Sequence, residues 1–148
     1  MKPLPRNRKG NSCTLHASCV AFEERAVLIT GGAGAGKSAL ALQMMSLGAV
    51  LVADDRTTIT RSGDMLVASS PATIRGMIEA RGIGILAAET LAAARPVLVV
   101  DLDRTETERL PSERETAILG ISLPLLHKVE SAVFPAAIMQ YLKGGRCA

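Results

Sequence analysis

The sequence has 148 residues and a formal net charge of +3, with 48% hydrophobic and 2% aromatic residues. This length allows one hydrophobic core and excludes two independent domains, and the apolar content excludes a disordered chain. The scarcity of aromatic residues argues against recognition by stacking bases on aromatic platforms, and no apolar run reaches the roughly 20 residues of a membrane helix.

The basic charge is concentrated at the N-terminus. Residues 1–12 contain several basic residues and no acidic one, namely Lys2, Arg6, Arg8 and Lys9. We therefore predict a flexible basic tail over 1–12, with a nucleic-acid-binding arm or a targeting peptide as the alternatives, and a nearly neutral folded domain over 13–148. The three cysteines form no CxxC pair and indicate reduced thiols. We expect a cytoplasmic protein that binds neither nucleic acid nor a membrane.

Apolar runs with strand or helix character alternate along the chain. In order, they predict a strand at 14–22, a strand at 26–30, a helix at 38–47, a strand at 50–53, a hairpin of 57–60 with 65–68, and a short helix at 71–79. The second half of the chain predicts a loop at 81–85 that enters a strand, a strand at 97–102, a loop at 104–115, one or two strands within 118–126, and a helix at 133–142. This alternation predicts an α/β fold with a mixed sheet flanked by helices.

A phosphate-binding motif follows the second predicted strand. The run Gly31-Gly32-Ala33-Gly34-Ala35-Gly36-Lys37-Ser38 matches G-x-x-x-x-G-K-[ST] between a strand and a helix. Its glycines let consecutive backbone N–H groups point into one concavity, where they and the helix N-terminus bind phosphate oxygens. In this motif Lys37 reaches the β- and γ-phosphates and the Ser38 hydroxyl is a ligand for Mg²⁺. The motif predicts a nucleotide site in a P-loop fold.

Acidic residues end two of the predicted strands. Asp54 and Asp55 follow one strand, and Asp101 and Asp103 end another. Ligands in open α/β sheets bind beside the carboxyl ends of strands, so either pair can face the phosphates. A carboxylate near the γ-phosphate can accept the proton of an incoming hydroxyl, which favours phosphoryl transfer over binding alone. The sequence has no [NT]-K-x-D motif for guanine, which disfavours a GTPase.

In chain order, these motifs resemble the C-terminal catalytic domain of the HPr serine kinase/phosphorylases, bacterial enzymes that phosphorylate a serine of the phosphocarrier protein HPr. The resemblance covers residues 14–88 and rests on Leu15-His16, the loop 31–38, Leu51-Val52-Ala53-Asp54-Asp55 and Ile78-Glu79-Ala80-Arg81-Gly82-Ile83-Gly84-Ile85. It implies a nucleotide-binding core like that of phosphoenolpyruvate carboxykinase. The chain is similar to the compact form found in alphaproteobacteria, without the N-terminal domain usual in the family.

The resemblance implies roles for the residues around the phosphates. Asp55 would be the base that takes the serine proton, with support from Asp54. Lys37 would hold the β- and γ-phosphates of ATP, while Ser38 and Glu79 would hold Mg²⁺.

Three further residues match catalytic positions of the family. His16 would position the attacking group, Arg81 would shape the transfer site, and Arg109 would steady the transferred phosphoryl. Judged without the resemblance, His16, Glu79 and Arg109 also have ordinary interpretations. His16 is typical of a strand histidine whose hydrogen bonds are satisfied, Glu79 of a surface acid at a helix end, and Arg109 of a charged loop.

Two segments depart from the family pattern. Residues 91–96 replace an alanine/glycine-rich stretch, and residues 126–131, Leu-His-Lys-Val-Glu-Ser, replace a P-V-x-P-G-R-N loop that is important for the reverse, phosphorolytic reaction. The second departure argues against phosphorylase activity.

These observations predict an ATP- and Mg²⁺-dependent serine kinase that acts on HPr in phosphotransferase-system regulation. Pyrophosphate is an alternative donor, and the resemblance implies a homohexamer. One alternative function is a small-molecule kinase in which residues 104–114 form an arginine-bearing lid. The other is a non-catalytic nucleotide sensor that binds a partner protein, for which Asp55 and Glu79 should point away from the phosphate loop.

Overall fold

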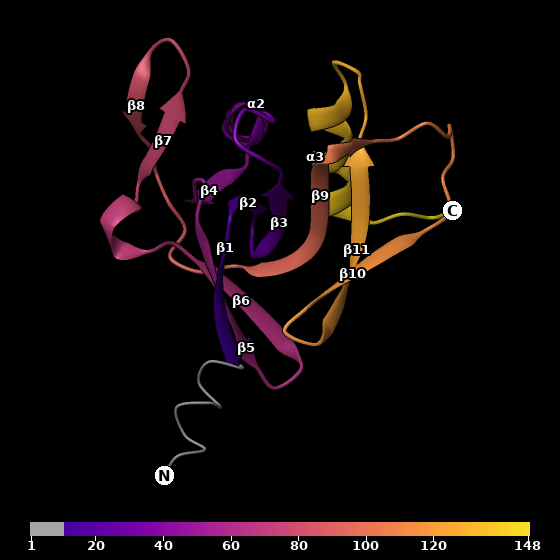
Figure 1. Ribbon diagram of the computed structural model, residues 1–148, viewed down its shortest axis with the longest axis horizontal. Coiled ribbons are helices and arrows are strands. Elements are labelled where there is room, and N and C mark those ends of the chain that lie inside the picture. Colours follow the sequence, from indigo (N-terminus) through magenta and orange to yellow (C-terminus); the bar gives the residue numbers. More distant parts are fainter. Residues whose placement is uncertain (1–10) are drawn as a thin grey trace.

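The computed structural model of the chain describes residues 11–148, so the predicted basic tail at 1–12 falls almost wholly outside the described residues. The central sheet contains β2 (Ala17–Phe22), β3 (Arg25–Thr30), β4 (Val50–Ala53), β9 (Arg95–Thr105), β10 (Arg114–Ile118) and β11 (Ile121–Lys128). Its strand order is β10-β11-β9-β3-β2-β4 (Figure 1). β9 pairs in parallel with β3 and β11, whereas the other pairs are antiparallel. The predicted mixed sheet is confirmed.

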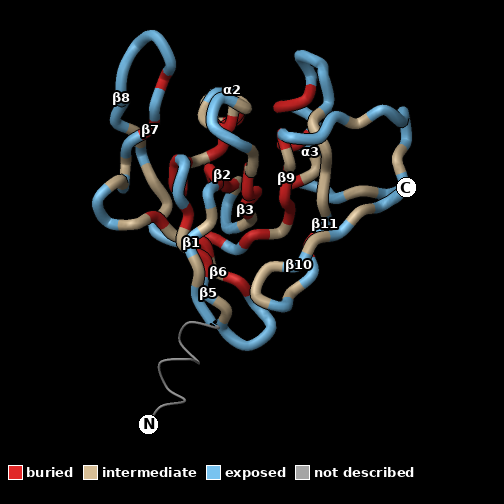
Figure 2. Tube along the Cα trace, viewed as in Figure 1, coloured by how far each residue is buried: buried red, intermediate tan, exposed pale blue. Residues whose placement is uncertain are grey.

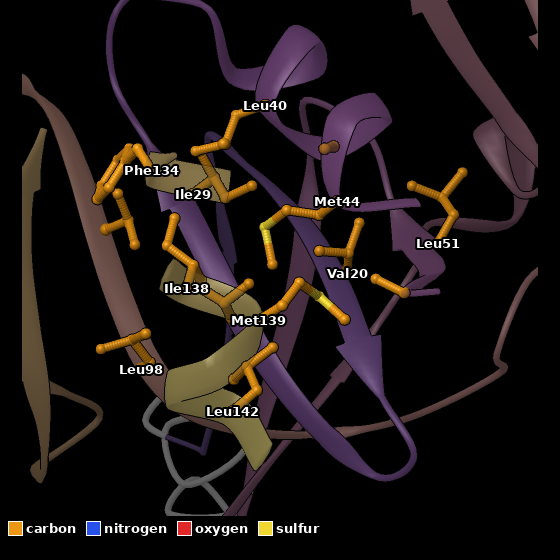
Figure 3. Packing of buried hydrophobic residues seen from close by; sticks show 14 of the residues in the cluster. Val20, Ile29, Leu40, Met44, Leu51, Leu98, Phe134, Ile138, Met139 and Leu142 are labelled. Carbon is orange, nitrogen blue, oxygen red and sulfur yellow. The ribbon is translucent and has the colours of Figure 1, made fainter. Parts of the chain in front are cut away.

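Two helices cover one face of this sheet, α2 (Lys37–Ser46) and α3 (Phe134–Gly144). Because side chains alternate along a strand, every second strand residue points to this face. The residues packed there are buried and apolar, and Figure 3 labels Val20, Ile29, Leu40, Met44, Leu51, Leu98, Phe134, Ile138, Met139 and Leu142. This packing holds α2, and with it the loop that precedes α2, against β3.

The opposite face of the central sheet is covered by a second sheet and not by helices. This sheet has the order β1-β5-β6, with β1 at Ser12–Leu15, β5 at Thr57–Ser62 and β6 at Met65–Ser69. Ile59 and Leu66 pack there against Leu28 and Val52 of the central sheet. The expectation of a sheet flanked by helices is therefore correct for one face only. Side chains of the 57–69 hairpin alternate between buried and exposed, which suits a sheet with one solvated face.

The strand predicted at 14–22 is two strands, separated at His16. β1 pairs with β5, whereas β2 pairs with β3 and β4 in the central sheet. The chain changes sheets at this break, which leaves the His16 side chain exposed, with 61% of its surface accessible. An apolar run cannot reveal such a change of partner.

The helix predicted at 71–79 is wrong. Only the 3-10 turn η1 forms there (Ala72–Ile74), followed by β7 (Met77–Ala80), which pairs with β8 (Gly84–Ala87). Gly76 has φ +79°, a left-handed conformation that ends the turn, and its carbonyl accepts the N–H of Ala88. The β7–β8 hairpin projects from the body and is exposed along most of its length (Figures 1 and 2).

The second half of the chain has longer strands than predicted. β9 extends to Thr105 and β10 begins at Arg114, so the predicted loop at 104–115 shortens to residues 106–113. β10 and β11 form an antiparallel hairpin around Leu119 and Gly120. No helix within residues 11–148 is long and apolar enough to cross a membrane.

Candidate active site

The phosphate loop, residues 31–38, joins the end of β3 to the start of α2, as predicted. Gly34 (φ +82°) and Gly36 (φ +104°) have left-handed backbones, which glycine adopts without steric cost. The Lys37 side chain is only 6% exposed, and its Nζ donates to the carbonyls of Gly31 (2.8 Å) and Gly32 (3.1 Å). The ammonium group is therefore held over the loop, next to backbone N–H groups that bind anions in this motif.

Asp54 is a buried carboxylate that connects four elements. Its Oδ1 accepts hydrogen bonds from the hydroxyls of Ser18 (2.8 Å) and Ser38 (2.6 Å), and its Oδ2 accepts the backbone N–H of Glu79 (3.0 Å). The donors belong to β2, α2 and β7, while Asp54 itself follows β4. Hydrogen bonds to an ionised group are about twice as strong as neutral ones. Asp54 therefore positions the first turn of α2 against the end of β4.

Asp55 differs from its neighbour in both backbone and exposure. Its φ of +65° is unusual for a residue other than glycine, and 56% of its side chain is accessible. Its Oδ1 lies 2.8 Å from His16 Nε2 and 3.8 Å from Lys37 Nζ, and its backbone N–H donates to Ser18 Oγ at 3.0 Å. Strained backbones of this kind cluster at functional sites. The carboxylate is thus turned toward the phosphate loop, which is the opposite of what the sensor alternative requires.

A pocket of about 750 Å³ gathers most of the predicted site residues. It is lined by His16, Gly34, Lys37, Ser38, Asp55, Glu79 and Arg81, among others. The break between β1 and β2, the phosphate loop, the end of β4 and the β7–β8 hairpin each contribute to its wall. Glu79 is exposed, as a surface acid would be, but it lies on strand β7 and lines this pocket, and the predicted helix end does not form.

The oxygen atoms of this pocket suit Mg²⁺. Ser38 and Glu79 supply a hydroxyl and a carboxylate, and the Asp54 carboxylate contacts both residues. Within residues 11–148 no three His, Cys, Asp or Glu side chains gather in a metal-binding group. Mg²⁺ at a kinase site is commonly held by one or two carboxylates together with substrate phosphates and water. The residues present therefore fit Mg²⁺ bound together with a nucleotide.

The structure does not bring Arg109 into this pocket. Arg109 is exposed in the loop between β9 and β10, and that loop is held at its ends by a 3.1 Å ion pair between Glu106 and Arg114. The backbone N–H of Glu108, followed by the Arg114 guanidinium and the N–H of Thr107, lowers the pKa of the Glu106 carboxyl. These contacts hold the two ends of the loop together. In the strand order the loop lies on the opposite side of β9 from Asp55, the predicted proton acceptor.

Two supporting residues were missed or given no role by sequence reasoning. Ser18 is fully buried, and its hydroxyl donates to Asp54 and accepts the N–H of Asp55. Asp103 Oδ1 accepts the N–H of Gly32 at 3.1 Å and so holds the start of the phosphate loop, and neither Asp101 nor Asp103 lines the large pocket. A serine inside an otherwise apolar strand is the one signal that could have identified Ser18.

Comparisons with known proteins agree with this arrangement. The chain matches the family described as the HPr serine kinase C-terminal domain over residues 8–127. It is 42% identical to an HPr kinase/phosphorylase of Aromatoleum aromaticum, over 75% of this chain and 38% of that protein. It is 36% identical to one of Xanthomonas campestris pv. campestris, over 76% of this chain and 41% of that protein.

The match therefore spans about two fifths of the length of these curated relatives. The fold is similar to the solved structure of the HPr(Ser) kinase/phosphatase from Coxiella burnetii. The TM-score is 0.74 at 27% identity, and the match covers 88% of this chain and 94% of that one. The chain belongs to the HPr serine kinase C-terminal domain family.

Proposed function

We propose that this chain is a protein serine kinase that transfers the γ-phosphoryl group of ATP to a serine of HPr. Membership of the family supports the reaction class. The observation that carries the proposal is the position of Asp55, whose Oδ1 is 2.8 Å from His16 Nε2 and 3.8 Å from Lys37 Nζ. A candidate base thus stands beside the cation that would hold the γ-phosphate.

The phosphate loop would bind the triphosphate through its backbone N–H groups and Lys37. The Lys37 ammonium donates to two loop carbonyls, and these bonds can be exchanged for bonds to the β- and γ-phosphates. Ser38 and Glu79 would hold Mg²⁺, which when bound neutralises charge on the phosphates. Asp54 would keep the Ser38 side chain oriented. The proposal includes a core like that of phosphoenolpyruvate carboxykinase.

Asp55 would accept the proton of the substrate serine. As the serine oxygen bonds to the γ-phosphorus, the bond to the β,γ-bridging oxygen breaks and ADP leaves. The imidazole of His16, bonded to Asp55 Oδ1, would keep the carboxylate aimed at the incoming hydroxyl. Arg81, on the pocket wall, would shape the approach of the serine. For Arg109 to steady the transferred group, the loop at 106–113 must rearrange.

A protein substrate suits this site better than a small metabolite. The β7–β8 hairpin beside the pocket exposes apolar side chains, with Ile83 78% and Ile85 63% accessible, and Ile83 itself lines the pocket. An exposed apolar rim is typical of a protein-binding surface. No residue of 104–114, the lid of the small-molecule alternative, lines the pocket. The same exposed hairpin also suits contacts between copies, and we include a homo-oligomer in the proposal.

The test is a transfer assay with purified chain, Mg-ATP and HPr from the same organism. We expect label on an HPr serine. Asp55→Asn should lower the transfer rate by about 10² to 10⁴-fold, the range typical of general-base catalysis, while ATP still binds. Lys37→Ala should weaken ATP binding. Asp64→Asn, in the exposed turn between β5 and β6, is the matched control and should leave the rate unchanged.

Each other outcome has a defined meaning. Full activity of Asp55→Asn would reject Asp55 as the base. ATP binding without any transfer would favour the sensor alternative, and labelling of a metabolite but not of HPr would favour a small-molecule kinase. In the reverse direction, we expect phosphoserine-HPr with inorganic phosphate to yield no pyrophosphate, because residues 126–131 depart from the family loop.

A further inference from the structure

A second pocket of about 430 Å³ lies beside the start of α2 and adjoins the pocket that contains Asp55, with which it shares Gly36, Ala39 and Gln43. Its apolar wall includes Leu40, Leu102 and Phe134, and its polar groups include Gln43, Glu130 and Ser131. The volume falls within the roughly 300–1,000 Å³ typical of small-molecule sites, which combine apolar walls with a few polar groups. Apart from the phosphate-loop residues Ala35 and Gly36, no residue that lines it has a role in the proposed transfer reaction.

The phosphate loop gives the bound triphosphate a direction. Lys37 and Ser38, which serve the β- and γ-phosphates in this motif, line the large pocket and not the second one. Ala35 lines the second pocket only, and Gly36 and Ala39 line both pockets, so the second pocket borders the same loop and the first turn of α2. A triphosphate with its γ-end at Lys37 would therefore leave the loop, at its α-end, toward the second pocket.

The sheet topology supports the same direction. β9 and β11 run parallel to β3, so their carboxyl ends open at the edge where the phosphate loop lies. Leu102, near the end of β9, and Lys128, at the end of β11, both line the second pocket. In sheets of this kind, ligands bind in the crevice outside the carboxyl ends of the strands.

We propose that the second pocket holds the nucleoside half of the nucleotide, an inference that rests on the proposed function as an ATP-dependent kinase. A nucleobase has flat apolar faces and polar edges, which match the apolar wall and the amide, carboxylate and hydroxyl groups of this pocket. The competing location is the part of the large pocket near Leu42 and Ile83. That pocket must also admit the substrate serine to Asp55, whereas the second pocket is free of this requirement.

The test compares ATP with inorganic tripolyphosphate, which has the same phosphates and no nucleoside. Ala132 is exposed and lines the second pocket, so Ala132→Trp should fill the pocket without disturbing the core. Ala136→Trp is the matched control, because Ala136 is exposed on α3 and lines neither pocket. By calorimetry, Ala132→Trp should weaken ATP binding by at least about tenfold, or about 1.4 kcal/mol. Tripolyphosphate binding should stay within about twofold of the unmodified chain, and the control should change neither affinity.

A second measurement uses the unmodified chain and does not depend on how the variant folds. Photolabelling with 8-azido-ATP should mark the peptide 128–135 and not the hairpin 77–87. Unchanged ATP affinity in Ala132→Trp, equal loss of ATP and tripolyphosphate affinity, or label in the hairpin would each overturn the nucleoside assignment. If the unmodified chain binds ATP no more tightly than tripolyphosphate, this inference alone fails. If it binds neither, the proposed function fails with it.

Discussion

The two walls of the large pocket are built in opposite ways. One wall, formed by the phosphate loop and the end of β4, rests on the central core, and its Lys37 and Asp54 side chains are only 6% and 8% exposed. The other wall is the β7–β8 hairpin, in which every residue of β8 is exposed. Asp54 bonds to the Glu79 N–H and so links the two walls. The groups that would meet phosphate are thus held by the core, whereas the surface that would meet a protein partner is exposed.

The largest expected effect comes from truncating the core between the central sheet and the second sheet. Leu28 is fully buried in β3, and Leu28→Ala should lower the free energy of unfolding by about 2–5 kcal/mol, since it leaves a cavity. Ile85→Ala, on the exposed β8, should change it by less than about 0.5 kcal/mol. Urea unfolding of both variants checks the contrast. Equal losses would show that the hairpin is as tightly packed as the core.

A smaller loss of unfolding free energy is expected when Asp54, which links the two walls, is replaced. Asp54→Ala leaves the hydroxyls of Ser18 and Ser38 and the N–H of Glu79 without their acceptor. The cost of buried unsatisfied groups predicts a loss of about 1–3 kcal/mol in unfolding free energy. Asp54→Asn keeps an acceptor oxygen and should lose less. Urea titration measures both, with Asp64→Ala as the control, and an unaffected Asp54→Ala chain would contradict this account of the link.

Replacing Asp55 should change the free energy of unfolding in the opposite direction. Its φ of +65° is strained for Asp and relaxed for Gly, and its side-chain contacts are exposed and contribute little to stability. Asp55→Gly should therefore keep or raise the unfolding free energy, by up to about 1 kcal/mol, while transfer activity is lost. Thermal unfolding measures the stability of this variant, and the transfer assay measures its loss of activity. A clear loss of stability would mean that Asp55 supports the fold as Asp54 does.

The smallest effect concerns the loop that carries Arg109. Because the folded-state pKa of Glu106 is lowered, its stabilising contribution is complete above its usual pKa of 4.5 and is lost as the pH falls through the lowered value. The stability difference between the natural chain and Glu106→Gln should thus be constant near neutral pH and vanish in acid. Urea midpoints at several pH values measure it. A difference that persists unchanged in acid would contradict this account of the loop.

Much of the site could be predicted because its residues follow one another in short motifs. The loop 31–38 and the Asp54–Asp55 pair depend on local rules, namely glycine flexibility and acids at strand ends, and these rules act over a few residues. Ser18 could not be assigned, since its partner Asp54 is 36 positions away in the chain. The sequence predicts a helix around Glu79, because a short apolar run after a proline is compatible with either a helix or a strand. Only the pairing with β8 decides that this segment is a strand.

By itself, the sequence determined an α/β chain with a phosphate loop between a buried strand and a helix, because periodicity and glycine spacing are local properties. The tertiary structure alone decided three other features: the second sheet on one face, the change of sheets at His16, and the different environments of two adjacent aspartates. Each depends on which distant strands pair. The pairing of distant strands is selected by the burial of the whole core, so no short segment of the sequence determines it.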